Sequence, residues 1–127
     1  MAERAARVLV ADDDAFTRDI LGRFLVERGF DVRTASDGKE TLETLPTYLP
    51  DVVLLDIRMP EMDGIEVLEK IVEGDFDCGV IMISGEADLD VAKNTLTMGA
   101  ADFIYKPFDL DYLETSLLAK LISMGRP

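Results

Sequence analysis

The sequence predicts a doubly wound α/β domain in which a five-stranded parallel sheet is flanked by five helices. Two observations carry this prediction. Short apolar runs alternate five times with amphipathic helical stretches. The apolar runs are also continuous, as expected of strands that are covered on both faces. Strict alternation of strand and helix favours parallel strands joined by right-handed crossovers, which leaves few possible topologies.

The first elements are a strand, a helix and a second strand. The strands are predicted over residues 7–11 and about 31–35. The helix between them ends before Gly29, because glycine is favoured just past the end of a helix. Its apolar residues recur at a spacing of three or four and are Phe16, Ile20, Phe24 and Leu25.

The second helix is predicted to be short. It starts at Ser36 or Asp37 and is expected to end at Leu45, because the next residue is a proline, which interrupts helices. Residues 46–50 then form a loop that leads into the third strand.

The second half of the chain repeats the alternation. The remaining strands are predicted over residues 52–56, 79–83 and 102–105. The helices cover about 65–72, the stretch that ends near Gly99, and about 109–124. Their expected apolar faces are Ile65, Leu68 and Val72, then Leu89, Ala92 and Leu96, and finally Leu113, Leu117, Leu121 and Met124.

Composition narrows the possible functions. A chain of 127 residues with 48% hydrophobic content fits one globular domain, and we expect that domain to span residues 6–124 with no second domain. No apolar run reaches the roughly 18–20 residues of a membrane span, and the first residues of the sequence lack the apolar stretch that is typical of a signal peptide. The single Cys78 excludes an internal disulfide and suits a reducing compartment, so we expect a cytoplasmic protein. The formal charge of −13 argues against direct nucleic-acid binding by this domain.

Four of the predicted strands end in polar residues. The first is followed by Asp12, Asp13 and Asp14, the third ends at Asp56, and the last two lead into Ser84 and Lys106. Parallel strands bring their carboxyl ends to one edge of the sheet, which is where open α/β sheets bind ligands. These side chains are therefore expected to converge although they are distant in sequence.

Each residue type at this edge has a chemical use. Crowded carboxylates repel one another unless a cation intervenes, and oxygen ligands suit Mg²⁺. A serine hydroxyl and a lysine ammonium together favour an anion. Asp56, placed between them, is a candidate nucleophile for a phosphoryl group.

Simpler roles exist for each residue taken singly. An aspartate after a strand is often a helix N-cap, and Asp14 is our choice for that role. A strand-end serine is a common turn residue, and an isolated Lys-Pro pair, as at Lys106, is usually a surface lysine. The combination of all four features on successive strands favours a site.

Five segments together resemble the response-regulator receiver domain of two-component signalling, of the chemotaxis-regulator type. The resemblance covers about residues 6–124. The matching segments are 8–14, 56–64, 83–85, 99–102 and 106–108.

The resemblance implies a sheet order of 2-1-3-4-5 and phosphorylation of Asp56 by a partner histidine kinase or phosphotransfer protein. Mg²⁺ would contact Asp13, Asp56 and the main-chain carbonyl of Arg58, with Asp12 acting through water. Ser84 and Lys106 would bind the phosphoryl oxygens, and the peptide bond before the proline that follows Lys106 would be cis.

The resemblance also implies a conformational switch. The family's switch aromatic falls on Phe103, which cannot form the hydrogen bond of a tyrosine. The alternative is that Phe103 is only a core residue, as aromatic residues in strands usually are. Tyr105 would then be the aromatic of the output surface. That surface, formed by the fourth helix, fifth strand and fifth helix, is expected to bind an unknown partner or a second copy of the chain.

Two further residues are expected to control access to the phosphoryl site. Arg58 lies two residues after Asp56, and Glu86 lies two residues after Ser84. Their opposite charges allow a pair across the mouth of the site, although exposed pairs often contribute nothing measurable.

A signalling switch of this kind would catalyse only its own phosphorylation and dephosphorylation. Two alternatives remain open at this point. The first is a phosphatase-type hydrolase that works through an aspartyl-phosphate, although 127 residues leave no room for a substrate-binding cap. The second is a pseudo-receiver that only binds partners, although Asp56, Ser84 and Lys106 are all present.

Overall fold

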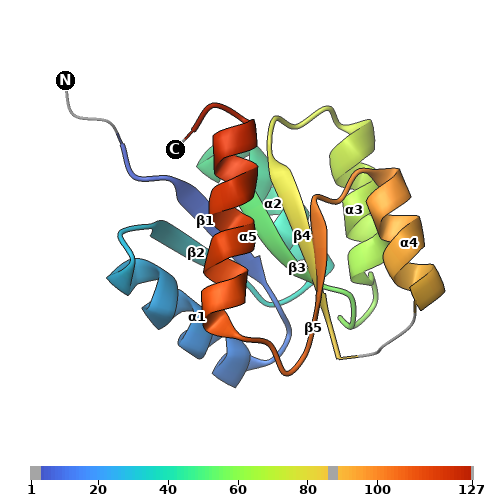
Figure 1. Cartoon of the computed structure of the whole chain (residues 1–127). Helices are drawn as coiled ribbons and strands as arrows, with labels where there is room; N and C mark the ends of the chain where they lie inside the picture. Colours follow the sequence, from blue (N-terminus) through green and yellow to red (C-terminus); the bar gives the residue numbers. More distant parts are fainter. Residues whose placement is uncertain (1–3, 86–88, 127) are drawn as a thin grey trace.

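The computed structural model describes residues 4–85 and 89–126 and contains a five-stranded parallel sheet with helices on both faces (Figure 1). The strand order is β2-β1-β3-β4-β5. The strands are β1 (Arg7–Ala11), β2 (Asp31–Ala35), β3 (Val52–Asp56), β4 (Gly79–Ser84) and β5 (Asp102–Tyr105). The helices are α1 (Ala15–Glu27), α2 (Gly38–Tyr48), α3 (Gly64–Glu73), α4 (Leu89–Met98) and α5 (Leu110–Ser123). The predicted fold class and strand order are confirmed.

The sheet separates two apolar layers. The three central strands are buried along almost their whole length, which is why their sequences read as continuous apolar runs. One layer contains buried residues of α1 and α5, among them Leu21, Leu25, Leu113, Leu117 and Leu121. The other contains buried residues of α2, α3 and α4, among them Leu45, Val67, Leu68, Ile71 and Ala92. Because all the strand pairs are parallel, the carboxyl ends of the strands share one edge of the sheet between these layers.

The predicted apolar faces of three helices were partly wrong. In α1, Phe16 is 70% exposed and Ile20 is 38% exposed, while Leu21 and Leu25 are buried. In α4, Leu89 and Leu96 are exposed, and in α3, Val72 is exposed. Each of these helices carries apolar residues on more than one side, and a helix lying on a sheet buries only one narrow stripe. Contact with the sheet selected that stripe.

The predicted end of α2 was also wrong. The helix continues through Pro46 to Tyr48 instead of ending at Leu45. A proline in the last turn forgoes one hydrogen bond, and the N–H of Leu49 still donates to the carbonyl of Leu45 over 3.0 Å. Tyr48 is 5% exposed, and its hydroxyl lies 2.6 Å from the carboxylate of Asp31 in β2. Burial of this tyrosine offsets the missing hydrogen bond.

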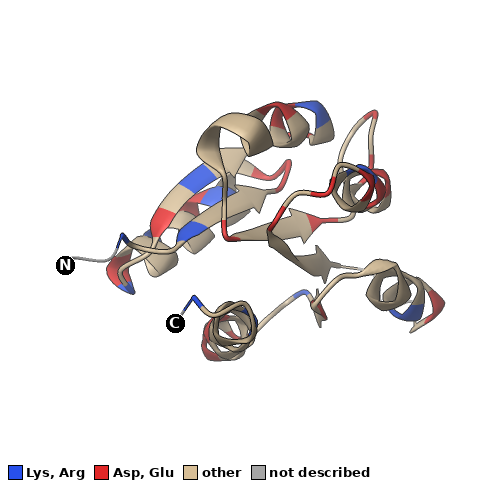
Figure 2. Cartoon of the chain, turned by 90° about the horizontal axis from the view of Figure 1, so that it is seen from above, with Lys and Arg blue, Asp and Glu red and all other residues tan. Residues whose placement is uncertain are grey.

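The surface charge is dispersed. Figure 2 shows acidic residues on several helices and loops around the sheet rather than on a single face. This distribution agrees with a mainly solvating role for most of the carboxylates. Across the ranges 4–85 and 89–126, none of the helices combines the length and apolar character that a membrane span requires.

A buried carboxylate joins both ends of the described chain at the amino edge of the sheet, where β1 begins and α5 ends (top of Figure 1). The Asp51 carboxylate accepts hydrogen bonds from the Arg4 guanidinium at 3.0 and 3.2 Å and from the main-chain N–H of Arg7 at 2.7 Å. Arg126 forms an ion pair with it at 3.2 Å. Burial alone would raise the pKa of Asp51, but these donors outweigh burial and hold the pKa below its usual value. Asp51 therefore stabilises the folded state in its charged form.

We predict that Asp51→Asn lowers the free energy of unfolding by about 2 kcal/mol at pH 7, since hydrogen bonds to a buried charged group each contribute roughly 1.5–3 kcal/mol. A depressed folded-state pKa stabilises the protein above the unfolded-state pKa and ceases to do so as pH falls. The difference between Asp51→Asn and wild type should therefore shrink below about pH 4. Urea unfolding across pH measures this, with Asp19→Asn as the matched exposed control. Equal losses at pH 3 and pH 7 would contradict the prediction.

Candidate functional site

The polar strand ends predicted to converge do so at the carboxyl edge of the sheet. Ala11 of β1 is in register with Leu55 of β3, so Asp12 follows beside Asp56. Asp56 is in register with Ile83 of β4, so Ser84 follows at the same edge. The N–H of Lys106 donates to the carbonyl of Ser84 over 2.7 Å, which attaches the end of β5 to the same place.

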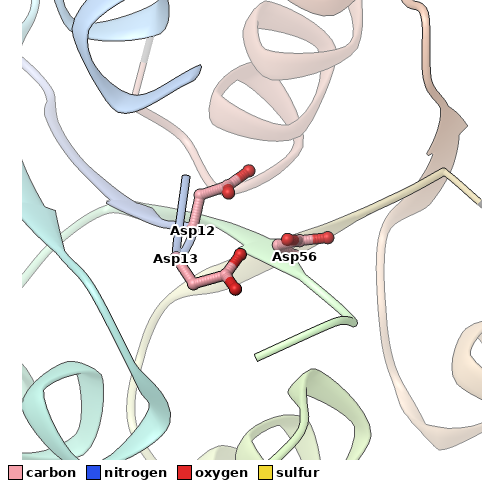
Figure 3. A group of neighbouring side chains, drawn as sticks. All are labelled: Asp12, Asp13 and Asp56. Carbon is pink, nitrogen blue, oxygen red and sulfur yellow. The ribbon is translucent and has the colours of Figure 1, made fainter. Parts of the chain in front are cut away.

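Three carboxylates form the centre of the site. One oxygen from each of Asp12, Asp13 and Asp56 lies within 4.8 Å of the others, and Figure 3 shows the three side chains side by side at the ends of β1 and β3. Asp12 is 2% exposed and Asp56 is 3% exposed, while Asp13 is exposed. The cluster thus has a buried base and an open side.

The third aspartate of the triplet caps α1. Asp14 has extended backbone angles, and its carboxylate accepts a hydrogen bond from the N–H of Phe16 at 3.2 Å and from the hydroxyl of Thr17 at 2.7 Å. The predicted N-cap role of Asp14 is confirmed. Because Asp14 starts the helix, Asp12 and Asp13 occupy the turn between β1 and α1.

Lys106 supplies the positive charge at the site. Its ammonium lies 3.0 Å from Oδ2 of Asp12 and 3.6 Å from Oδ2 of Asp56. Burial alone would lower the pKa of Lys106, but the hydrogen bond to Asp12 and the nearby Asp56 outweigh it and raise that pKa. Lys106 therefore stays protonated. The peptide bond between Lys106 and Pro107 is cis, as the family resemblance implied.

Asp56 is the carboxylate whose ionisation is hindered. Burial, reinforced by the charge of Asp12, raises the pKa of Asp56 to about 6, although Lys106 acts in the opposite direction. When all three carboxylates are ionised, they carry three negative charges. The Lys106 ammonium neutralises one of these charges, and two remain uncompensated. A hard divalent cation fits this all-oxygen donor set, since such ions bind carboxylate, carbonyl and water oxygens.

The turn after β3 depends on a glycine whose role was not argued from sequence. A Cβ atom on Gly64 would lie 2.3 Å from the carbonyl oxygen of Asp56 and 2.8 Å from the Cα of Ile57. The N–H of Gly64 donates to the carbonyl of Ile57 over 2.8 Å. Gly64 thus lets α3 begin directly against the strand end that carries Asp56. Its position at the start of a predicted helix was the available signal.

Arg18 is a second residue that sequence reasoning missed. It lies on α1, and its guanidinium donates to the main-chain carbonyl of Asp12 over 2.7 Å. The signal available in the sequence was a basic residue one helical turn after the acidic triplet.

The remaining predicted residues lie as follows. Ser84 is 2% exposed at the end of β4. Phe103 is 9% exposed. Its ring packs edge-on against the ring of Tyr105, with 5.1 Å between the two ring centroids. Arg58 is exposed, and its N–H lies 3.4 Å from Oδ1 of Asp56. Glu86, the predicted partner of Arg58, lies outside the described residues.

Fold and site together define a doubly wound α/β domain with carboxylates and a lysine gathered at the carboxyl edge of its sheet, where open α/β sheets bind ligands. The chain belongs to the response regulator receiver domain family, whose model matches residues 8–118. Domains of this family are phosphoacceptor switches of two-component signalling.

Individual relatives agree with this assignment. The chain is 40% identical to the chemotaxis protein CheY of Bacillus subtilis (strain 168) over 108 residues, covering 84% of this chain and 90% of that protein. It is 39% identical over 107 residues to the regulatory protein AtoC of Escherichia coli (strain K12), covering 84% of this chain but only 23% of AtoC. The chain therefore spans less than a quarter of that longer relative.

A solved structure of similar fold is the CheX–CheY–BeF₃–Mg²⁺ complex from Borrelia burgdorferi. Its matching chain superposes with a TM-score of 0.85 at 37% identity, over 91% of this chain and 89% of that one.

We predict that metal-free Asp56→Asn is more stable than wild type at pH 8, by about 1–3 kcal/mol, since each unit of pKa shift corresponds to about 1.4 kcal/mol. The direction of this stability change follows from the linkage between ionisation and folding. A carboxyl whose folded-state pKa is raised destabilises the folded state as pH rises through the interval between its unfolded value and about 6. The advantage should disappear near pH 4. Urea unfolding in EDTA measures it, with Glu69→Gln on the exposed side of α3 as control. A variant less stable than wild type at pH 8 would disprove the prediction.

Proposed function

We propose that this domain accepts a phosphoryl group on Asp56 from a phosphorylated histidine of a sensor kinase or phosphotransfer protein. The bond between phosphorus and the imidazole nitrogen breaks, its electron pair returns to that nitrogen, and a bond to a carboxylate oxygen of Asp56 forms. The partner must supply the histidine, because this chain contains none. The observation that carries the proposal is the position of the buried Asp56 carboxylate, with the Lys106 ammonium 3.6 Å away and the carboxylates of Asp12 and Asp13 beside it.

Mg²⁺ is the proposed cofactor. Asp13, Asp56 and the main-chain carbonyl of Arg58 would hold it, with Asp12 acting through water. The ion, when bound, offsets negative charge on the oxygens of the transferred group. The related complex from B. burgdorferi contains CheY together with BeF₃ and Mg²⁺, which supports the same ion at the acidic cluster of this chain.

Lys106 and Ser84 are proposed to bind the phosphoryl oxygens. Lys106 carries a fixed positive charge at the carboxyl edge, and a charge-assisted hydrogen bond to an oxyanion is among the stronger ones. Its ammonium forms a 3.0 Å hydrogen bond to Asp12 and lies 3.6 Å from Asp56, so it can contact a phosphoryl group carried by Asp56. Ser84 ends the neighbouring strand and carries a hydroxyl that can donate to the same group.

Access of water to the phosphorylated site is proposed to depend on Arg58 and Glu86. Arg58 is exposed two residues beyond Asp56, and a guanidinium there can cover part of the approach to the phosphorus. Replacing Arg58 and Glu86 together by alanine should then shorten the lifetime of the phosphorylated state without changing the fold.

The proposed output surface consists of α4, β5 and α5. Tyr105 lies in register beside Ser84, and its ring contacts that of Phe103. A movement of the Ser84 hydroxyl toward a phosphoryl group can therefore displace both aromatic residues, because they lie close to Ser84. We propose that residues 6–124 act as the switch, and that this surface binds a partner or a second copy of the chain.

We predict that incubation with acetyl phosphate and MgCl₂ adds one phosphoryl group to the wild-type chain, and that Asp56→Asn abolishes the addition because it removes the nucleophilic oxygen. Intact mass spectrometry measures the gain. Asp19→Asn on the exposed side of α1 is the control and should label normally.

The same measurement separates the alternative functions. A phosphatase-type hydrolase would turn over without accumulating a labelled chain, and a pseudo-receiver would neither label nor turn over. Label that persists in Asp56→Asn and maps to Asp13 would show that the acceptor is wrongly assigned.

We predict that a phosphoryl mimic changes amide hydrogen exchange in α4, β5 and the start of α5. The physical reason is the register of Ser84 with Tyr105, which links the site to this face. Exchange is measured with MgCl₂ alone and with MgCl₂ plus beryllium fluoride. Changes confined to α2 and α3 would refute the proposed output surface.

A further inference from the structure

We infer that Arg18 is a positioning residue for the acidic site: its guanidinium holds the main-chain carbonyl of Asp12 and thereby fixes the turn that carries Asp12 and Asp13. The inference rests on the proposed function, in that the turn is taken to supply ligands for Mg²⁺. Arg18 would not touch the ion or the phosphoryl group, and would act only through the backbone of Asp12.

The hydrogen bonds of Asp12 carry the argument. Its N–H donates to the carbonyl of Ala35 over 3.1 Å, and its carboxylate accepts from the N–H of Asp14 at 2.9 Å and from the Lys106 ammonium at 3.0 Å. Its carbonyl accepts from Arg18 at 2.7 Å. The main chain and the carboxylate of this residue are therefore held by four partners, which lie at the end of β2, at the N-cap of α1, within α1 and just after β5.

Of the four hydrogen-bond partners of Asp12, Arg18 is the one that donates to its main-chain carbonyl. Asp12 is buried and lies past the end of β1, and a buried carbonyl needs a hydrogen-bond donor. Arg18 provides that donor from within α1. The same peptide unit links Asp12 to Asp13, so holding this carbonyl restricts the rotation that would swing the exposed Asp13 carboxylate away from Asp56. A metal site loses affinity when the groups that orient its ligands are removed.

Charge and positioning make opposite predictions for this residue. If Arg18 acted only through its positive charge, removing it would make the acidic cluster more negative and would strengthen Mg²⁺ binding. If Arg18 positions the turn, removing it weakens Mg²⁺ binding, in spite of the more negative site. The direction of the change therefore separates the two roles.

The test is titration of MgCl₂ by calorimetry into wild type, Arg18→Met, Arg18→Lys and the control Arg23→Met. Arg23 is on the same helix, is 78% exposed and pairs with Asp19, so Arg23→Met changes the net charge by the same amount without touching Asp12. We expect Arg18→Met to bind Mg²⁺ about tenfold more weakly than wild type, at the lower end of the range for orienting residues of metal sites. Arg18→Lys should recover most of the loss because it keeps a charged donor, and Arg23→Met should bind as wild type or slightly more tightly.

A second measurement follows the turn without metal. Amide exchange in EDTA should rise in Arg18→Met at residues 12–14 and stay unchanged in α3 and α5. A wild-type chain that does not respond to MgCl₂ would overturn the metal part of the proposed function, and the exchange result would still decide whether Arg18 holds the turn. Wild-type binding together with equal or tighter binding by Arg18→Met would overturn the inference, as would unchanged exchange at residues 12–14.

Discussion

The arrangement of this site depends on the electrostatic cost of placing two buried carboxylates side by side. Asp12 and Asp56 are almost inaccessible to water, and one ammonium, that of Lys106, lies within 3.0 and 3.6 Å of them. Burial and like charge raise the pKa of Asp56 to about 6 because its charged form is poorly compensated. The edge is therefore short of positive charge in the protein alone, and a bound cation would relieve the deficit.

The opposite edge of the same sheet shows the contrasting case. Asp51 is equally buried, yet donors from Arg4, Arg7 and Arg126 surround its carboxylate and keep its pKa low. One edge holds a satisfied carboxylate that ties the described chain ends together, and the other holds unsatisfied charge. Proteins retain such unfavourable electrostatics mainly where function requires it. This contrast favours the carboxyl edge as the functional one independently of family membership.

The parallel sheet connects the acidic site to the aromatic residues of β5. Asp56 is in register with Ile83 of β4, and the next residue, Ser84, is in register with Tyr105 of β5. A change at the acidic cluster has a short, packed route to the aromatic pair Phe103 and Tyr105, whose rings are in contact. In the other direction, α1 reaches back to the cluster through Arg18. Close-packed protein interiors have low compressibility and transmit displacements.

The sequence alone determined the strands, the fold class and the strand-end residues that come together, because a buried parallel strand imprints a continuous apolar run and ends where that run stops. It could not determine which side of a helix faces the sheet: Phe16 and Leu21 are both apolar, and only packing chose Leu21. The sequence also led to a wrong end for α2, which continues through Pro46. The contact of Tyr48 with Asp31 that accompanies this longer helix joins segments that are distant in the sequence. The pKa of Asp56, the packing of Gly64 and the bond from Arg18 to Asp12 likewise required the tertiary structure. Local sequence patterns indicate which helix faces and turns are possible. Contacts between segments that are far apart in the sequence form only when the chain folds, so the local pattern does not contain them.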